Sequence, residues 1–232
     1  MRAITAPFEK AGFLAIPVER WVVVGDSHVG AIRAEELTRP AVVVGVGGAT
    51  AIGLRNPNSM TDAVGTFTRE LLPPLAGTVP VIHLGEVDCG FVIWWRAAKY
   101  GEPVDHQLKV AIEAQLAFVD TLLSAGYSTV VLTAPSPPTI REGIDWGDVA
   151  NLRREVNVPL KQRTALALEY AQRIGEGAAL RGLPYIDFLS ITLDPSTGVL
   201  LDDFRHPDPR DHHLHPDRMA TVWAGALNAL AD

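Results

Sequence analysis

Residue types that suit acyl transfer lie at two distant points of this chain. Gly-Asp-Ser at 25–27 follows a run of valines, and four of the seven histidines fall within HPDPRDHHLH at 206–215. Acyl transfer by a serine needs a nucleophilic hydroxyl, a histidine base and an aspartate that orients the histidine. Ser27 is therefore the candidate nucleophile, with the alternative that its hydroxyl only caps a helix beginning there.

The histidine-rich segment leaves two candidates for the base. Asp211 lies two residues before His213 and four residues before His215, so the spacing leaves either histidine open. A metal-dependent hydrolase is a separate alternative, because histidine and aspartate are also zinc ligands. The metal-capable residues of the segment are His206, Asp208, Asp211, His213 and His215.

A third polar segment, LGEVDCG at 84–90, combines two carboxylates with the single cysteine. Buried carboxylates need partners, so Glu86 and Asp88 predict a site or an ion pair, with Arg96 as the candidate cation. One cysteine excludes an internal disulfide, and we expect Cys89 to fill core space rather than to act as a nucleophile. Trp94 has two interpretations: a platform for the apolar face of a sugar ring, or a core residue.

Short apolar runs predict the strands that position these residues. The runs are rich in β-branched residues and nearly continuous, which is typical of parallel strands buried on both faces. Helical patterns alternate with them, which predicts βαβ units and an open parallel sheet covered by helices on both faces. The predicted strands are 21–24, 41–46, 79–84, 129–133 and 184–188, and the predicted helices are 105–125, 159–181 and 216–230.

The candidate residues follow these strands directly. In open α/β sheets the active site lies at the carboxyl ends of the strands. Ser27 follows the first strand, and we expect it to begin a helix that includes Ala31, Ile32 and Leu37. The glycine-rich turn at 45–48 follows the second strand, where small residues let backbone N–H groups approach a ligand. Two predicted long loops, 134–150 and 189–215, are further functional candidates.

Length, composition and charge limit the class of protein. A chain of 232 residues with 47% hydrophobic residues suits one domain, 1–232, with a substantial core. The formal charge of -7 argues against nucleic acid and anionic membranes as partners, because both favour a basic face. The first thirteen residues lack the apolar core of a signal peptide, and no apolar run reaches the length of about 20 residues that spans a bilayer. We therefore expect a cytoplasmic protein.

The motifs resemble those of the SGNH (GDSL) hydrolase family, in the family's order. Gly-Asp-Ser27 resembles the first motif, and the turn at 45–48 resembles the second, whose glycine donates an N–H to the oxyanion hole. Gly-Glu-Val-Asp88 resembles the third, normally Gly-x-Asn-Asp, and Asp211-His-His-Leu resembles the last, normally Asp-x-x-His. The resemblance implies a three-layer α/β/α sandwich with a mainly parallel, flavodoxin-like five-stranded sheet.

The sequence departs from the family pattern at two points. Val87 replaces the asparagine of the third motif, which removes a side-chain donor from the oxyanion hole. In other enzymes the loss of one such donor costs about 10²–10³ in rate. No aspartate lies three residues before a histidine, and the leucine that follows His213 favours it over His215 as the base.

The resemblance implies a serine-dependent esterase or acyltransferase that acts on a small O-acyl ester through an acyl-enzyme, without a cofactor or metal. The stretch at 85–101 also resembles SGNH-like domains encoded with glycan biosynthesis, so an acetylated carbohydrate is the candidate substrate. A non-catalytic binding module on the same fold is the alternative that Val87 favours. The predicted catalytic residues are Ser27, His213, Asp211 and His215, the oxyanion donors are Ser27 and Gly48, and the substrate-binding residues are Asp26, His28, Glu86, Asp88, Trp94 and Arg96.

Overall fold

A computed structural model describes residues 16–142 and 156–231 of the chain. The first thirteen residues, which lack the apolar core of a signal peptide, and part of the predicted loop 134–150 lie outside the described residues. Five parallel strands form one sheet in the order β2-β1-β3-β4-β5. This is the flavodoxin-like order, and the predicted fold class is confirmed. The strands are β1 (Arg20–Gly25), β2 (Ala41–Gly45), β3 (Thr78–His83), β4 (Val131–Thr133) and β5 (Tyr185–Ile186).

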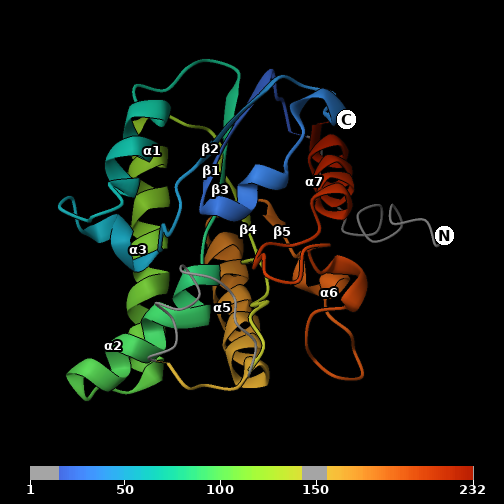
Figure 1. Ribbon diagram of the computed structural model, residues 1–232. Coiled ribbons are helices and arrows are strands. Elements are labelled where there is room, and N and C mark those ends of the chain that lie inside the picture. The colour runs from blue at the N-terminus through green and yellow to red at the C-terminus, as the bar shows by residue number, and fades with distance from the viewer. Residues whose placement is uncertain (1–15, 143–155, 232) are drawn as a thin grey trace.

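Helices cover both faces of the sheet. Figure 1 shows α1 and α3 on one side of the strands and α7 on the other. The α-helices are α1 (Ala63–Leu71), α2 (Ile93–Tyr100), α3 (Val104–Ala125), α5 (Leu160–Leu180), α6 (Leu189–Thr192) and α7 (Pro216–Ala231). Short 3₁₀ segments are η1 (Ser27–Ala31), η2 (Ala34–Glu36), η3 (Ile52–Arg55) and η6 (Asp202–Phe204), and η4 (Asp88–Val92) is a π-helical turn. In the described part of the chain, no helix has the length and apolarity needed to cross a bilayer.

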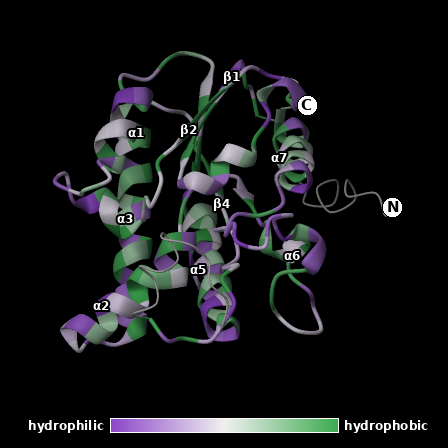
Figure 2. Ribbon diagram, in the orientation of Figure 1, coloured by the Kyte–Doolittle hydropathy of each residue, from purple (hydrophilic) through white to green (hydrophobic). Residues whose placement is uncertain are grey.

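Alternate residues of the strands enter two separate cores. On β1, Val22 and Val24 pack with α1, α3 and α5, whereas Trp21 and Val23 pack with α7. Successive strand side chains point to opposite faces, so a continuous apolar run is what a sheet covered on both sides requires. The strands are correspondingly among the most hydrophobic parts of the ribbon in Figure 2.

Most predicted elements are present, with two differences. β2 is partly exposed rather than buried on both faces, with Val42 39% exposed, because this strand forms an edge of the sheet. The predicted helix from Ser27 through Leu37 is instead two short 3₁₀ turns, η1 and η2. Ile32 has extended backbone angles, and Gly30 lowers the helix propensity of the segment just before it.

Hydrogen bonds tie the carboxyl ends of neighbouring strands together. Gly25, the last residue of β1, is paired in register with Gly45 of β2 and with His83 of β3. Beyond the strands, the Val46 N–H donates to the Gly25 carbonyl (2.9 Å) and the Asp26 N–H donates to the His83 carbonyl (3.2 Å). The segments that follow β1, β2 and β3 therefore start from one edge of the sheet.

His83 lies fully buried at this edge. Its ring nitrogens form hydrogen bonds with the hydroxyl groups of Thr133 (2.7 Å) and Ser136 (3.0 Å). Its ring lies edge-on to the Trp223 ring, with 5.1 Å between the ring centroids. Burial lowers the pKa of His83 to about 4, so the ring is neutral near neutral pH. This histidine is a structural group of the core.

The titration of His83 predicts a loss of stability in acid. Its pKa is about 4 when folded, against 6.5 for a free ring, so the unfolded chain binds the proton first. The stability from neutral His83 is full above pH 6.5 and is lost as the pH falls toward 4. We expect this group to remove about 3 kcal/mol of unfolding free energy over that range.

Urea unfolding at several pH values measures this effect. The His83→Gln variant lacks the titrating ring, so its stability should decline less in acid than that of the wild type. The difference in unfolding free energy between the two proteins should therefore shrink as the pH falls. A difference that stays constant with pH would contradict the prediction.

Candidate active site

The backbone presents Ser27 at the carboxyl edge of the sheet. A Cβ on Gly25 would lie 2.3 Å from the His83 carbonyl oxygen, so the strand must end in glycine for β1 and β3 to approach this closely. Asp26 then caps η1, its carboxylate accepting the His28 N–H at 2.9 Å. Ser27 follows as the first residue of η1 and is partly exposed.

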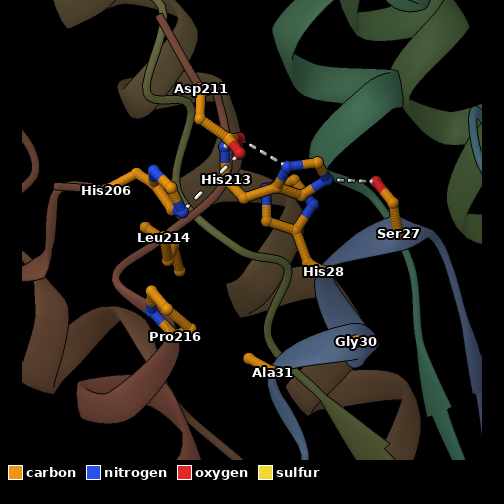
Figure 3. A pocket seen from close by; sticks show the side chains of 9 residues that line it. All are labelled: Ser27, His28, Gly30, Ala31, His206, Asp211, His213, Leu214 and Pro216. Carbon is orange, nitrogen blue, oxygen red and sulfur yellow. Dashed lines mark hydrogen bonds and ion pairs between the residues drawn. The ribbon is translucent and has the colours of Figure 1, made fainter. Parts of the chain in front are cut away.

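A chain of hydrogen bonds joins Ser27 to His213 and Asp211 (Figure 3). Ser27 Oγ lies 2.9 Å from His213 Nε2, and His213 Nδ1 lies 2.6 Å from Asp211 Oδ1. A carboxylate is only an acceptor, so Nδ1 carries a proton and Nε2 of the neutral ring accepts from the Ser27 hydroxyl. This is the arrangement in which a histidine can take the proton of an attacking serine.

Asp211 is held as an anion in this chain of bonds. Partial burial opposes its charge, but hydrogen bonds from the backbone and ring of His213 and the neighbouring charges of His213 and His206 outweigh the burial. The pKa of Asp211 is therefore below its usual value. The carboxylate stays available to stabilise a protonated His213 ring.

Both ends of the histidine-rich segment are fastened to the structure. Arg205 and Leu214 form an isolated antiparallel bridge, and the His215 N–H donates to the Phe204 carbonyl at 2.8 Å. The segment between them is a closed loop that carries His213 to Ser27. Of the two candidate bases, the structure thus brings His213, and not His215, to the serine.

Gly48 lies in a tight turn after β2. The Ala49 N–H donates to the Val46 carbonyl at 3.0 Å, and Gly48, the third residue of this turn, has a φ of +71°. Type I′ and type II turns need a positive φ at this position, which glycine adopts without strain. Val87, which replaces the expected asparagine, is buried and apolar, so it supplies no donor.

Asp88 was predicted to bind substrate, and the structure corrects that assignment. Its side chain is fully buried, and its oxygens accept the N–H groups of Ala51 (2.7 Å) and Ile52 (3.2 Å). Burial raises the pKa of Asp88 to about 7, although the two backbone donors favour its charged form. Asp88 therefore fixes the segment that follows the Gly48 turn.

Cys89 is also buried in the core. Burial, together with the nearby carboxylates of Asp88 and Glu86, raises the pKa of its thiol well above the usual value. The thiolate is the nucleophilic form, so this environment disfavours reaction at Cys89. The predicted packing role agrees with its position.

The other predicted substrate-binding residues differ in their positions. Asp26 is fully buried and bonds to His28, so it is a cap rather than a substrate contact. The contacts with His28 outweigh the burial of Asp26 and keep its pKa below the usual value. His28 itself lines the cavity beside Ser27, with its ring centroid 5.1 Å from that of His213.

Glu86, Trp94 and Arg96 are not among the residues that line the cavity beside Ser27. Glu86 is buried, and Trp94 packs against the core while its indole N–H donates to the Cys89 carbonyl at 2.7 Å. Arg96 donates to Gln107 at 2.7 Å and lies 5.0 Å from the centre of the Tyr100 ring, in place of the predicted ion pair with Glu86 or Asp88. These contacts favour a structural role for Trp94 and Arg96, and their part in substrate binding stays a prediction.

Two cavities flank the histidine-rich loop. The cavity beside Ser27 has a volume of about 230 Å³, and a smaller one of about 110 Å³ lies next to it. His206, Asp211 and His213 line both cavities. The first is drawn in Figure 3 and is lined by Ser27, His28, Gly30, Ala31, His206, Asp211, His213, Leu214 and Pro216.

One group of residues in this loop could hold a metal ion. Ligand atoms of Asp211, His212 and His213 lie within 4.8 Å of one another. Asp211 and His213 already bond to each other in the chain that ends at Ser27. A metal ion on these residues would therefore compete with that chain of hydrogen bonds.

Comparison with known proteins places the fold. No protein-family model and no curated protein matches this chain. Among solved structures, a GDSL-like lipase from Bacteroides thetaiotaomicron is 16% identical over 90% of this chain and 87% of its own, with a TM-score of 0.59. The aryl esterase of M. smegmatis is 14% identical over 92% and 100% of the two chains, with a TM-score of 0.56.

A carbohydrate acetylesterase from Sinorhizobium meliloti is similar in the same way. It is 13% identical to this chain over 91% of this chain and 96% of its own, with a TM-score of 0.53. At this level of identity the similarity concerns the fold. The chain therefore has the fold of GDSL-type lipases and esterases. This confirms, for the fold, the resemblance that the motifs indicated.

Proposed function

We propose that this protein, with the fold of GDSL-type esterases, is a serine esterase that acts on small O-acyl esters. The observation that carries the proposal is the hydrogen-bond chain from Ser27 Oγ through His213 to Asp211, with distances of 2.9 and 2.6 Å. The nucleophile, the base and the carboxylate that orients the base each lie within hydrogen-bond reach of the next. The position of the serine after the first strand supports the same function.

In the proposed mechanism, Ser27 Oγ attacks the ester carbonyl while His213 Nε2 accepts the hydroxyl proton. Asp211 holds the ring in the required tautomer and stabilises its charge. The tetrahedral intermediate collapses when His213 returns the proton to the leaving alcohol, and an acyl-Ser27 ester remains. A water molecule then attacks this ester, with His213 again as the base, and the acid is released.

The negative oxygen of the intermediate needs donors at the sheet edge. The backbone N–H groups of Ser27 and Gly48 are the proposed pair, and the fixed turn at Gly48 supports its part in it. Because Val87 supplies no side-chain donor, we expect rates about 10²–10³ below those of a site with a third donor. Slow turnover is thus part of the proposal.

The small cavity favours a small ester. A volume of about 230 Å³ beside Ser27 is below the range of about 300–1,000 Å³ typical of pockets for drug-sized ligands. Short acyl chains on a compact alcohol, such as an acetylated sugar, fit this space. The similar proteins that are named as an aryl esterase and a carbohydrate acetylesterase support this choice of ester.

Hydrolysis of p-nitrophenyl esters of increasing chain length tests the proposal. We expect kcat/KM for the acetate to exceed that for the octanoate by about tenfold or more, because a cavity of about 230 Å³ leaves most of the longer chain without contacts. An acetylated monosaccharide should release acetate under the same conditions. Preference for the long chain would contradict a small-ester site.

Two controls separate the alternatives. A chelator should leave the rate unchanged, whereas loss of activity with the chelator and recovery with added zinc would favour the metal-dependent alternative. Added alcohols that capture the acyl group in preference to water would identify an acyltransferase, which shares the acyl-enzyme.

A further inference from the structure

We propose that His206 is a positioning residue that holds the second oxygen of Asp211. This inference rests on the proposed roles of Ser27, His213 and Asp211. Asp211 Oδ1 accepts from both the ring and the backbone N–H of His213, at 2.6 and 2.9 Å. Asp211 Oδ2 faces His206 Nε2 at 3.6 Å, so the carboxylate lies between two imidazole rings (Figure 3).

The shorter of two backbone contacts favours one tautomer of His206. The Asp208 N–H donates to His206 Nδ1 at 3.1 Å. An accepting Nδ1 has no hydrogen, so in the neutral ring the hydrogen is on Nε2, the atom that faces Asp211. The Asp208 carbonyl is farther away, 3.4 Å from Nδ1, and would be the partner of Nδ1 in the other neutral tautomer.

The loop holds His206 at this place. Arg205, the residue before it, pairs with Leu214 and donates to the carbonyl oxygen of Thr139 at 3.2 Å. Only about a quarter of the His206 side chain is exposed, and the side chain lines both cavities of the loop. Its ring is therefore part of the wall behind Asp211.

A donor on Oδ2 restricts the rotation of a carboxylate that is otherwise fastened through Oδ1 alone. Asp211 lies on a loop and its side chain is 35% exposed, so without this donor it could turn away from His213. The 3.6 Å separation is longer than a hydrogen bond. Contacts of this kind often shorten when the reacting complex forms, here as His213 becomes charged.

Two substitutions of similar size distinguish the effect of a hydrogen-bond donor to Asp211 from the effect of the space that the His206 side chain fills. His206→Gln keeps an N–H donor where the ring has Nε2, whereas His206→Leu fills the space without a donor. With p-nitrophenyl acetate we expect kcat of His206→Leu to fall about tenfold, while KM stays nearly unchanged. This loss is smaller than the rate contribution of general-base catalysis, because the base itself remains. His206→Gln should keep kcat within about threefold of the wild type.

Nuclear magnetic resonance of protein with ¹⁵N-labelled histidine adds a readout that needs no activity. The wild type should show His206 with its hydrogen on Nε2, and a far-downfield proton for the short bond from His213 to Asp211. His206→Leu should move that proton upfield, and His206→Gln should restore it.

The outcomes decide the inference in each case. Equal kcat for wild type and His206→Leu, equal loss in both variants, or a hydrogen on His206 Nδ1 would overturn it. If Ser27→Ala retained full activity, the proposed function would be wrong. The position of the His213 proton in His206→Leu would then decide the positioning role alone, and an unchanged position would overturn it.

Discussion

Replacing Ser27 with alanine is expected to lower the hydrolysis of p-nitrophenyl acetate by at least about 10³-fold, because the acyl-enzyme can no longer form. The Ser27 hydroxyl is 2.9 Å from His213 Nε2, the distance at which the proposed base would accept its proton. A fluorophosphonate should therefore add once to the wild type and not to Ser27→Ala. Initial rates and intact mass after labelling measure the two effects.

Ser196→Ala is the matched control for this substitution. Ser196 is exposed, its hydroxyl donates to Asp194, and it lines neither cavity of the histidine-rich loop, so its removal changes the same chemical group outside the candidate site. It should keep both turnover and labelling. Labelling that persists in Ser27→Ala would place the nucleophile elsewhere. A wild type with neither labelling nor turnover would favour the non-catalytic binding module, or an acyltransferase that needs its own donor.

Replacing the two candidate bases should give opposite results. His213→Gln removes the ring that joins Ser27 to Asp211, and we expect kcat/KM to fall by about 10³-fold or more. His215→Gln should stay within a few-fold of the wild type, because its backbone N–H, which donates to Phe204, is retained. Rates with p-nitrophenyl acetate at about pH 8, where a free histidine is neutral, test both variants.

Thermal unfolding of both histidine variants is the control for folding. A large loss in His215→Gln together with full activity in His213→Gln would reverse the assignment of the base. Equal losses in two well-folded variants would show that the loop as a whole, and not one ring, determines activity.

The sequence predicted the sheet and the place of the serine because both follow from local patterns. Runs such as Trp-Val-Val-Val at 21–24 are buried on both faces of the sheet, and only a parallel sheet between helices provides that environment. Gly-Asp-Ser follows such a run, so its position at the carboxyl edge was also predictable. The choice of His213 came from the resemblance, since the spacing alone left His215 open.

What the sequence did not predict depends on contacts between distant segments. Asp88 bonds to the backbone of Ala51 and Ile52, and no pattern around Asp88 indicates which N–H groups will approach it. α1 and α2 were not predicted, because α1 has only nine residues with Gly65 in its first turn, and α2 has only eight and continues directly from the π-helical turn η4. The sequence indicated His206 only as a possible metal ligand. Its position beside Asp211 depends on the pairing of Arg205 with Leu214, which closes the loop.

The bond between Ser27 and His213 joins residues 186 positions apart in the chain. During synthesis Ser27 therefore leaves the ribosome long before His213 is added to the chain. Contacts at such separation form late, after the loop entropy has been overcome. The segment with His213 is followed by α7, which docks through Met219 and Trp223 on the second core. Because α7 covers one face of the sheet, its undocking would open the second core and separate His213 from Ser27, so the proposed activity requires a docked α7.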